Sequence, residues 1–266
     1  MTEATNFYVY LSRGRVLLIG DSLEGDEHRH HALQITINLE PNAFTLRQGN
    51  SEFATQGIII NPNAPHHVIS SDEWRAVLLL DAQTQYSQQI KQRFAAAANV
   101  YSLGTDDLNF CRARLHDFRA QAQSIENADS AISAIIDRLA GPVRNPLMHN
   151  REGHPRIAKA LSYIHQAQGK ALTLNQLAEH VFLSESRLSH LFKAEIGIPI
   201  QRYLLWYKVV QTAFNIGRGM SLTDAAEEAG FADSAHFSRT FRAMFGLTPS
   251  QILKRSQHVQ IISDTD

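Results

Sequence analysis

The chain has 266 residues, of which 44% are hydrophobic and 19% charged. This composition excludes an intrinsically disordered protein, and the length suits two ordinary domains. A single cysteine, Cys111, excludes a disulfide framework and a cysteine-based zinc module. The chain starts without a basic segment followed by an apolar stretch, and its apolar runs are strand-sized. We therefore expect a soluble, cytoplasmic protein with no membrane partner.

Charge is distributed unevenly along the chain, although the formal net charge is only −1. Residues 1–155 carry 13 Lys and Arg against 17 Asp and Glu, a net charge of −4. Residues 156–256 carry 12 against 7, a net charge of +5, and the last ten residues add two acids. The basic charge is thus concentrated in the C-terminal half, where a polyanionic partner could bind.

The N-terminal part alternates short apolar segments with turn residues. The apolar segments are 16–20, 33–39, 43–46, 57–60 and 74–80. Their lengths, β-branched content and partial period of two predict antiparallel strands that close into a sandwich or a small barrel.

Beyond residue 81 the apolar residues follow the period of a helix. Two stripes are formed by Leu108, Cys111, Leu115 and Phe118, and by Ile132, Ile135, Ile136 and Leu139. Two such helices either cover the β domain or form the seam of a dimer, and the spacing alone leaves both possibilities open. On its stripe, Cys111 is expected to be a core residue rather than a nucleophile.

A segment rich in proline and glycine, 141–155, predicts an exposed connection between two domains. The predicted organisation is therefore a β domain with a helix pair over 1–140, a linker over 141–155, a helical domain over 156–256 and a tail over 257–266. The predicted fold class is α+β with two domains.

The helical domain contains an internal duplication. At an offset of 48, Leu174, Ala178 and Glu179 meet identical residues, and at an offset of 49 the same holds for Ser189, Phe192, Ala194, Gly197 and Leu204. Each copy opens with a capping box, at Thr173 and at Ser221, and continues as a short helix, a turn and a second helix that stops at Gly197 or Gly246. This order predicts two helix-turn-helix units, whose second helices can enter a DNA major groove.

Each second helix divides into an inner and an outer face. The inner residues are Leu188, Leu191 and Phe192 in the first helix and Phe237, Phe241 and Phe245 in the second; the outer residues are Ser186, Ser189, His190 and Lys193, and Ala235, Ser238, Arg239 and Arg242. Hydroxyl, imidazole and guanidinium groups can read base edges, while Lys193 and Arg242 suit phosphates. An ordinary solvated face would look similar for one helix, but the duplication and the local positive charge favour the DNA interpretation. Between the copies, 200–216 predicts a helix whose aromatic stripe, with Trp206, belongs to the core.

Residues 156–255 resemble the DNA-binding domain of the AraC/XylS family of bacterial transcription regulators, most specifically in the run from Ser221 to Pro249. The resemblance implies base-facing positions at Ser186, Ser189 and His190, and at Ser234, Ala235, Ser238 and Arg239. We add the adjoining Arg187 and His236 to the DNA-binding set. The resemblance also implies promoter DNA, RNA polymerase and a small-molecule effector as partners. It further implies a homodimer, with residues 1–140 as the effector-sensing and dimerisation domain.

The same resemblance implies a cupin-like N-terminal domain. The first cupin motif usually has His-x-His followed four or five residues later by Glu; this chain has His28-Arg29-His30 and then Gln34, with His31 as a further candidate. The second motif is similar to residues 62–67, which end in His66 and His67. We take His28, His30, Gln34 and His67 as the candidate effector or metal site. Three neutral imidazoles can hold Zn²⁺, Ni²⁺ or Fe²⁺, and no cofactor is certain.

Three hypotheses follow for the function. The first is an effector-controlled, sequence-specific transcription regulator, and the second is a regulator that senses metal through the same histidines. The third is a cupin-type dioxygenase or isomerase, against which stands the absence of a carboxylate or any other acid–base constellation. We expect a regulator and not an enzyme.

Overall fold

The computed structural model describes residues 7–261, except residues 13, 22, 24, 70–72, 95–97, 121–123, 142–153 and 168–170. The chain divides into two compact units. The first comprises Met1–Ala82, Tyr86–Pro146 and Phe241–Asp266, and the second comprises Gln83–Gln85 and Leu147–Thr240. Most of the predicted linker, 142–153, lies outside the described residues.

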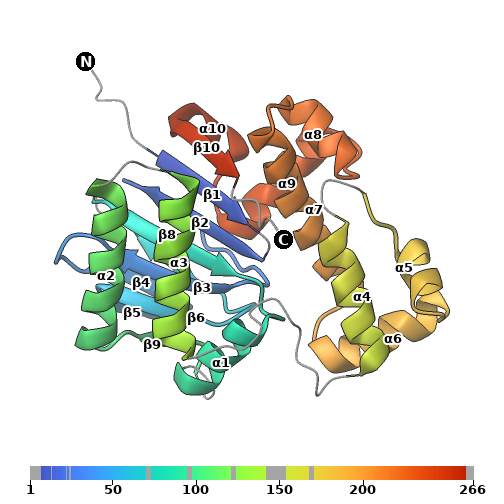
Figure 1. Ribbon diagram of the computed structural model, residues 1–266, viewed down its shortest axis with the longest axis horizontal. Coiled ribbons are helices and arrows are strands. Elements are labelled where there is room, and N and C mark those ends of the chain that lie inside the picture. Colours follow the sequence, from blue (N-terminus) through green and yellow to red (C-terminus); the bar gives the residue numbers. More distant parts are fainter. Residues whose placement is uncertain are drawn as a thin grey trace. The chain divides into compact units, whose positions relative to one another are not determined.

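Two sheets form the first unit (Figure 1). The larger sheet has the order β10-β1-β2-β8-β3-β6-β9, and the smaller has the order β5-β4-β7. The strands are β1 (Phe7–Ser12), β2 (Arg15–Gly20), β3 (Leu33–Asn38), β4 (Phe44–Gln48), β5 (Ser51–Thr55), β6 (Gly57–Ile60), β7 (His67–Ile69), β8 (Arg75–Leu80), β9 (Val100–Ser102) and β10 (Ser256–Ile261). Every pairing among the strands from β1 to β9 is antiparallel, as the sequence predicts.

The strand β10 falls in what the sequence analysis takes as the end of the helical domain and a tail. It runs parallel to β1, with Val259 opposite Val9 and Ile261 opposite Leu11. The alternation of polar and apolar residues from His258 to Ile261 is a strand signal that the sequence analysis missed. It is too short to be distinguished from a loop until its partner strand is known.

Successive side chains of the larger sheet point to its opposite faces and belong to two separate apolar clusters. Ile58 and Ile60 of β6 join Phe44 and Leu46 of β4 in a cluster between the two sheets. Ile59, from the same strand, points the opposite way, into the main core. This alternation is the period-two geometry of a strand that is buried on both faces.

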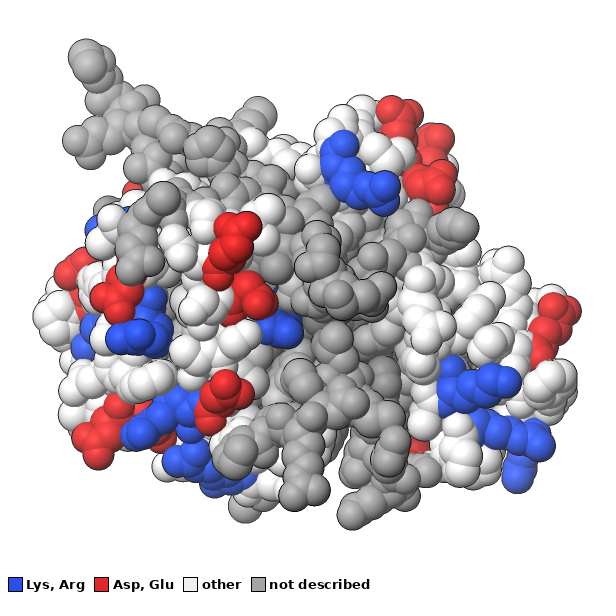
Figure 2. All heavy atoms as spheres, in the orientation of Figure 1, with Lys and Arg blue, Asp and Glu red and all other residues white. Residues whose placement is uncertain are grey.

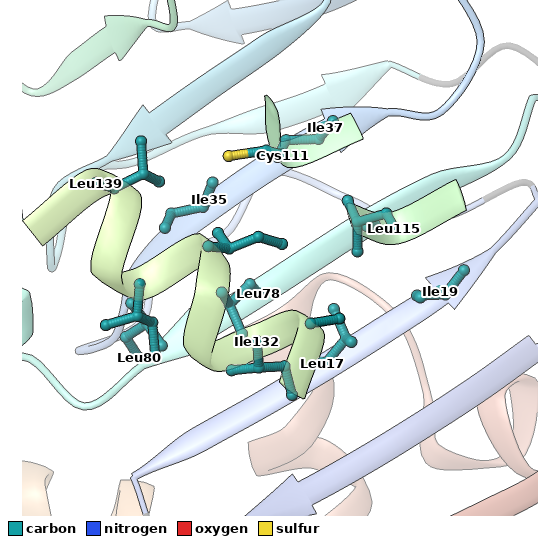
Figure 3. Close-up of a cluster of buried hydrophobic side chains, with 14 of the residues drawn as sticks. Leu17, Ile19, Ile35, Ile37, Leu78, Leu80, Cys111, Leu115, Ile132 and Leu139 are labelled. Atoms are coloured by element: carbon teal, nitrogen blue, oxygen red, sulfur yellow. The ribbon is translucent and has the colours of Figure 1, made fainter. Parts of the chain in front are cut away.

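The main core lies between the larger sheet and two helices, α2 (Thr105–Ala120) and α3 (Ile125–Ala140) (Figure 3). Both predicted apolar stripes are buried in it, including Cys111, whose thiol pKa is raised to about 12 by burial. The interpretation of the two helices as a cover for the β domain is therefore confirmed. These stripes cannot also serve as a dimer seam.

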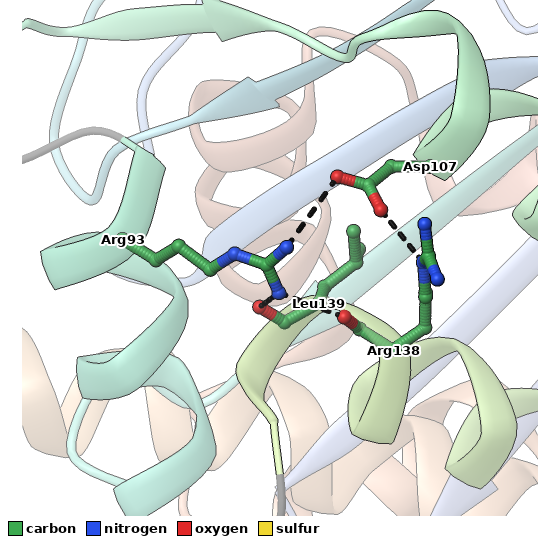
Figure 4. Close-up of polar contacts among 4 residues, drawn as sticks. All are labelled: Arg93, Asp107, Arg138 and Leu139. Carbon is green, nitrogen blue, oxygen red and sulfur yellow. Dashed lines mark hydrogen bonds and ion pairs between the residues drawn. The ribbon is translucent and has the colours of Figure 1, made fainter.

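A third helix, α1 (Gln85–Phe94), is tied to α2 and α3 by an arginine pair (Figure 4). Arg93 donates to the carbonyl oxygens of Arg138 and Leu139, at 2.9 and 3.2 Å, in the last turn of α3. Asp107 of α2 accepts from Arg138 at 2.7 Å and lies 3.9 Å from Arg93. A cation on the terminal carbonyls of a helix stabilises its negative end.

The remaining helices come from the C-terminal part of the chain. They are α4 (Pro155–Gln166), α5 (Leu174–His180), α6 (Glu185–Ile196), α7 (Ile200–Gly217), α8 (Leu222–Glu228), α9 (Ser234–Phe245) and α10 (Pro249–Arg255). The boundary between the two units falls inside α9, so α10 and β10 belong to the first unit. Among the described residues, no helix is both long and apolar enough to cross a membrane.

Candidate nucleic-acid interface and histidine cluster

The helix-turn-helix units begin where the capping residues predict. Thr173 caps α5 with a complete capping box, in which its hydroxyl accepts from the backbone of Gln176 and the Gln176 side chain accepts from the backbone of Thr173. Ser221 caps α8 with one bond of this kind, in which its hydroxyl accepts from the backbone N–H of Asp224. These side chains satisfy amide groups that a helix start leaves without partners.

The second helices, α6 and α9, anchor through the inner residues that the sequence predicts. Leu188 and Phe192 are fully buried in the core of the second unit, with Leu191 partly buried beside them. In α9, Phe237 is buried, and Phe241 and Phe245 are half-buried. The joining helix α7 buries Trp206 with its aromatic neighbours, so Trp206 is a core residue.

The outer faces carry the predicted DNA-binding residues. Exposed on α6 are Ser186, Arg187, His190 and Lys193, with Ser189 half-buried; exposed on α9 are Ala235, His236, Arg239 and Arg242, with Ser234 and Ser238 half-buried. Among them, the side chains of Ser238 and His236 contact other residues of α9 or of the turn before it. The hydroxyl of Ser238 donates to the carbonyl of Ser234 at 2.8 Å, and the ring of His236 packs edge-on against Phe231. Arg239 is exposed on the same face of α9.

Arg242 has a partner that the sequence analysis did not expect. Its guanidinium donates to the carboxylate of Asp26 at 2.8 Å, and this contact holds the pKa of Asp26 below its usual value. Both residues belong to the first unit. The two backbone segments are also in direct contact, since the N–H of Asp26 donates to the carbonyl of Gly246 at 2.9 Å. A Cβ atom on Gly246 would lie 2.3 Å from the Asp26 carbonyl oxygen, so this approach requires glycine.

Basic and acidic side chains are interspersed over the helices of the first unit (Figure 2). Most of the ion pairs there are exposed or half-exposed, as between Arg114 and Asp117 on α2. Exposed pairs contribute little to stability, so this surface is read as an ordinary solvated one.

Three histidines of the first unit converge into one group. The ligating atoms of His28, His30 and His66 all lie within 4.8 Å of one another, with His30 and His66 buried and His28 half-buried. A two-way backbone bridge joins His28 to His66, each N–H donating to the other carbonyl at 3.0 Å. Gln34 completes the group, because its Oε1 lies 2.8 Å from Nε2 of His30 and 3.2 Å from Nε2 of His66.

The prediction of His67 as the third histidine is wrong in one respect: the structure places His66 in the cluster. Neighbouring residues of an extended segment point to opposite sides, so only one of the pair can face His28. The bridge assigns that place to His66, while His67 pairs with Arg47 across β4 and β7. His31, which follows His30, is turned away by the same alternation and meets Asn63.

Burial keeps the three imidazoles neutral. Desolvation, together with repulsion from the neighbouring histidines, lowers the pKa of His30 to about 4 and that of His66 to about 2. Desolvation also lowers the pKa of His28. Neutral imidazoles retain the lone pairs that bind metal ions, and they can also donate or accept hydrogen bonds with an organic ligand.

Comparison with known proteins concerns mainly the helical part of the chain. Residues 177–255 match the model of a helix-turn-helix domain. The arabinose operon regulatory protein of Escherichia coli is 32% identical over 109 residues, which are 38% of this chain and 37% of that protein. The C-terminal part of this chain is thus similar to a helix-turn-helix domain. The Msm operon regulatory protein of Streptococcus mutans is 27% identical to it over 118 residues, 42% of each chain.

The chain spans about two fifths of the length of the curated relatives that it matches. Among solved structures, ToxT from Vibrio cholerae matches with a TM-score of 0.53 at 11% identity, over 94% of this chain and 96% of ToxT. ToxT with a bound unsaturated fatty acid matches with a TM-score of 0.51 at 10% identity, over 94% of each chain. At this identity the likeness shows the fold alone, and it confirms the predicted α+β class with an antiparallel β part and a helical part.

The turn of the first helix-turn-helix unit contains an unusual residue. Phe182 has φ of +56° and is 80% exposed, whereas the equivalent position of the second unit is Gly230, with φ of +86°. The two positions correspond because their N–H groups make the same bond, to the carbonyls of Glu179 and Glu227. Left-handed backbone is costly for a bulky side chain. An offset of 48 in the duplication aligns Phe182 with Gly230, which is the signal that the sequence analysis missed.

Replacement of Phe182 by glycine should relieve this strain. We expect Phe182→Gly to leave the free energy of unfolding unchanged or raised by up to about 1 kcal/mol, whereas Phe182→Val lowers it by about 1 kcal/mol or more. The reporter is Trp206 fluorescence in urea, in a Trp74→Phe background, because Trp206 lies in the second unit. If both variants were equally destabilising, ring contacts rather than backbone strain would determine the effect.

The histidine cluster should make the first unit sensitive to acid. Because the pKa values of His30 and His66 lie below the ordinary 6.5 in the folded state, the unfolded chain takes up protons first. This stability is therefore fully present above about pH 6.5 and is lost as the pH falls towards the folded-state values. Each buried histidine should cost about 1.4 kcal/mol between pH 7.5 and 5.5.

Urea unfolding in the presence of chelator, followed by Trp74 in a Trp206→Phe background, measures this loss. The same change in pH should cost His66→Gln about 1.4 kcal/mol less than the parent protein. An identical pH dependence in the two proteins would show that His66 is not buried in its neutral form.

Proposed function

We propose that the protein is a sequence-specific DNA-binding transcription regulator whose first unit controls it through a bound effector. The observation that carries this proposal is the repetition of one device. Two capped helix-turn-helix units each bury an apolar face and expose a second helix that bears hydroxyl, imidazole or guanidinium groups. A single exposed helix face has many explanations, but two equivalent faces joined by one helix suit two neighbouring segments of a duplex.

The joining helix supports this interpretation by its length. The 18 residues of α7 span about 27 Å at the usual helical rise, and one turn of B-DNA is roughly 34 Å. The matching region of the E. coli relative comes from an operon regulatory protein, which is the same class of function. For the β part, the support is the fold shared with ToxT, which has been solved with a bound unsaturated fatty acid.

The partners follow from this function. We infer promoter DNA as the macromolecular ligand, RNA polymerase as the machinery on which the regulator acts, and a homodimer as the working form in the cytoplasm. The first unit is inferred to bind a small effector rather than to catalyse a reaction. An effector acts by preferring one of two arrangements of the protein, so its binding and DNA binding must influence each other.

Substitutions at Arg239 and Lys193 should separate base reading from phosphate binding. After selection of a preferred duplex from a random library, Arg239→Ala should lose about 1–3 kcal/mol of affinity for it and relax the choice at one base position. Lys193→Ala should weaken binding to all duplexes and reduce the slope of log affinity against log salt by about 1. Fluorescence anisotropy over a salt series measures both effects.

Equal losses for both variants on every duplex would contradict this assignment of roles. Lack of binding by the parent protein to any selected duplex would contradict the proposed function itself. Lys91→Ala serves as the charge control, since it removes one exposed positive charge from α1, which lies outside the predicted DNA-binding residues.

Removal of the Asp26 carboxylate should strengthen DNA binding. Asp26 occupies a donor of the Arg242 guanidinium and offsets its positive charge, so the carboxylate competes with a phosphate for this side chain. We expect Asp26→Asn to raise the affinity for DNA about twofold to fivefold, a modest effect because the ion pair is exposed. Glu27→Gln, an exposed acid next to it, is the control for net charge and should change affinity less. A gain of the same size in both variants would assign the effect to overall charge.

A further inference from the structure

We propose that His28, His30 and His66, with the side-chain oxygen of Gln34, form a binding site for a divalent first-row transition-metal ion, and that this ion is an effector of the protein. The site itself rests on the geometry of the first unit. Its regulatory role rests on the proposed function.

The backbone orients two of the imidazoles in the same way. Nδ1 of His28 donates to the carbonyl of Asp26 at 2.8 Å, and Nδ1 of His66 donates to the carbonyl of Ala64 at 2.9 Å. Each partner precedes its histidine by two residues. A carbonyl on one ring nitrogen fixes the tautomer and directs the other nitrogen, Nε2, with its lone pair towards the ligand. Metal-binding histidines are usually supported in this way.

The surroundings of His66 place an electron-rich oxygen against an electron-rich nitrogen. Both of its ring nitrogens face carbonyl oxygens, that of Ala64 at 2.9 Å and that of the Gln34 side chain at 3.2 Å. A neutral imidazole has only one N–H, and burial keeps this ring neutral. With the Gln34 amide in this orientation, one of the two contacts therefore lacks a proton. A cation between Nε2 of His66 and Oε1 of Gln34 would turn this repulsive contact into two coordinate bonds.

The fourth donor is held in place. Gln34 lies on β3, is buried, and its amide nitrogen donates to the hydroxyl of Thr36 at 2.8 Å. In this orientation of the amide, its oxygen faces the histidines. A tetrahedral ion with bonds of about 2.0–2.1 Å needs donor atoms about 3.4 Å apart, so donors within 4.8 Å of one another reach it by small rotations of the rings.

The donor set selects the class of ion. Three imidazole nitrogens and one neutral oxygen suit Zn²⁺, Ni²⁺, Fe²⁺ or Co²⁺, whereas Mg²⁺ and Ca²⁺ require carboxylates, carbonyls and water. No carboxylate belongs to the cluster among the described residues. The bound ion would therefore keep its full charge of two, which limits affinity and permits exchange.

Asp26 connects this cluster to a predicted DNA contact. Its carbonyl accepts from the His28 ring, its N–H donates to Gly246, and its carboxylate binds Arg242. An ion that fixes His28 also polarises the ring N–H and strengthens its bond to Asp26. The ion should thereby hold Asp26 on Arg242 and lower the affinity for DNA.

Zinc titration of the full-length, tag-free, chelator-stripped protein tests the site without DNA. Calorimetry should give one Zn²⁺ per chain with a Kd of about 1 μM or tighter, and Co²⁺ should give the visible absorption of a four-coordinate ion. Both signals should disappear in His66→Gln. His67→Gln is the matched control, since it makes the same change one residue away and should bind as the parent does. Loss in neither variant, or in both, would overturn the site.

A gain-of-function variant keeps the test decisive if His66→Gln fails to fold. Gln34→Glu supplies the missing carboxylate, so it should bind Zn²⁺ at least about tenfold more tightly than the parent while unfolding more easily without the ion. Unchanged or weaker binding by a folded Gln34→Glu protein would count against Gln34 as a ligand.

The regulatory role of the ion is tested by a separate measurement, the effect of Zn²⁺ on DNA affinity. Zn²⁺ at saturating concentration should weaken binding to the selected duplex in the parent, and should do so less in Asp26→Asn and not at all in His66→Gln. Zinc binding without any change in DNA affinity would overturn the regulatory part and leave the site. DNA binding without zinc binding would overturn the site and leave the proposed function.

Discussion

The backbone bridge between His28 and His66 is the constraint on which the chemistry of the first unit depends. Two hydrogen bonds of 3.0 Å join segments that lie far apart in the sequence, and they set which side chains face each other. Because side chains alternate along an extended segment, the bridge brings His28, His30 and His66 together and turns His31 and His67 away. A shift of one residue in this pairing would exchange the whole set and leave Gln34 without imidazole partners.

The helical domain was predictable because its signals are local. A capping residue, a stripe of apolar side chains and a terminal glycine each specify a helix boundary within one turn of the chain, as at Thr173 and Gly197. The duplication repeats these signals, so each copy supports the other. The strands of the first unit and the cover formed by α2 and α3 were predictable for a related reason, since burial on one side imposes a period on the sequence.

The features that sequence reasoning missed depend on pairings between distant segments. Nothing in the order of His66 and His67 tells which of them faces His28 until the bridge is known. The strand β10 acquires its identity only from β1, and the bond between Asp26 and Arg242 only from the approach of Gly246 to that loop. Phe182 differs, because its left-handed conformation follows from the duplication itself, in which the second copy has Gly230.

A cluster of neutral donors suits a sensor better than a catalyst. Without a carboxylate, the cluster supplies no negative charge to neutralise the ion, and the ion must compensate for the hydrogen bond between His30 and Gln34 that it displaces. When the affinity for the ion is modest, the occupancy of the site follows changes in the free concentration of the ion. A site that binds the ion very tightly stays occupied and does not respond. The same modest affinity limits what the ion can do at Arg242, because an effector shifts an equilibrium only by the difference in its affinity for the two states. The exposed bond from Asp26 to Arg242 is weak on the same scale, so a modest effector and a modest switch are matched.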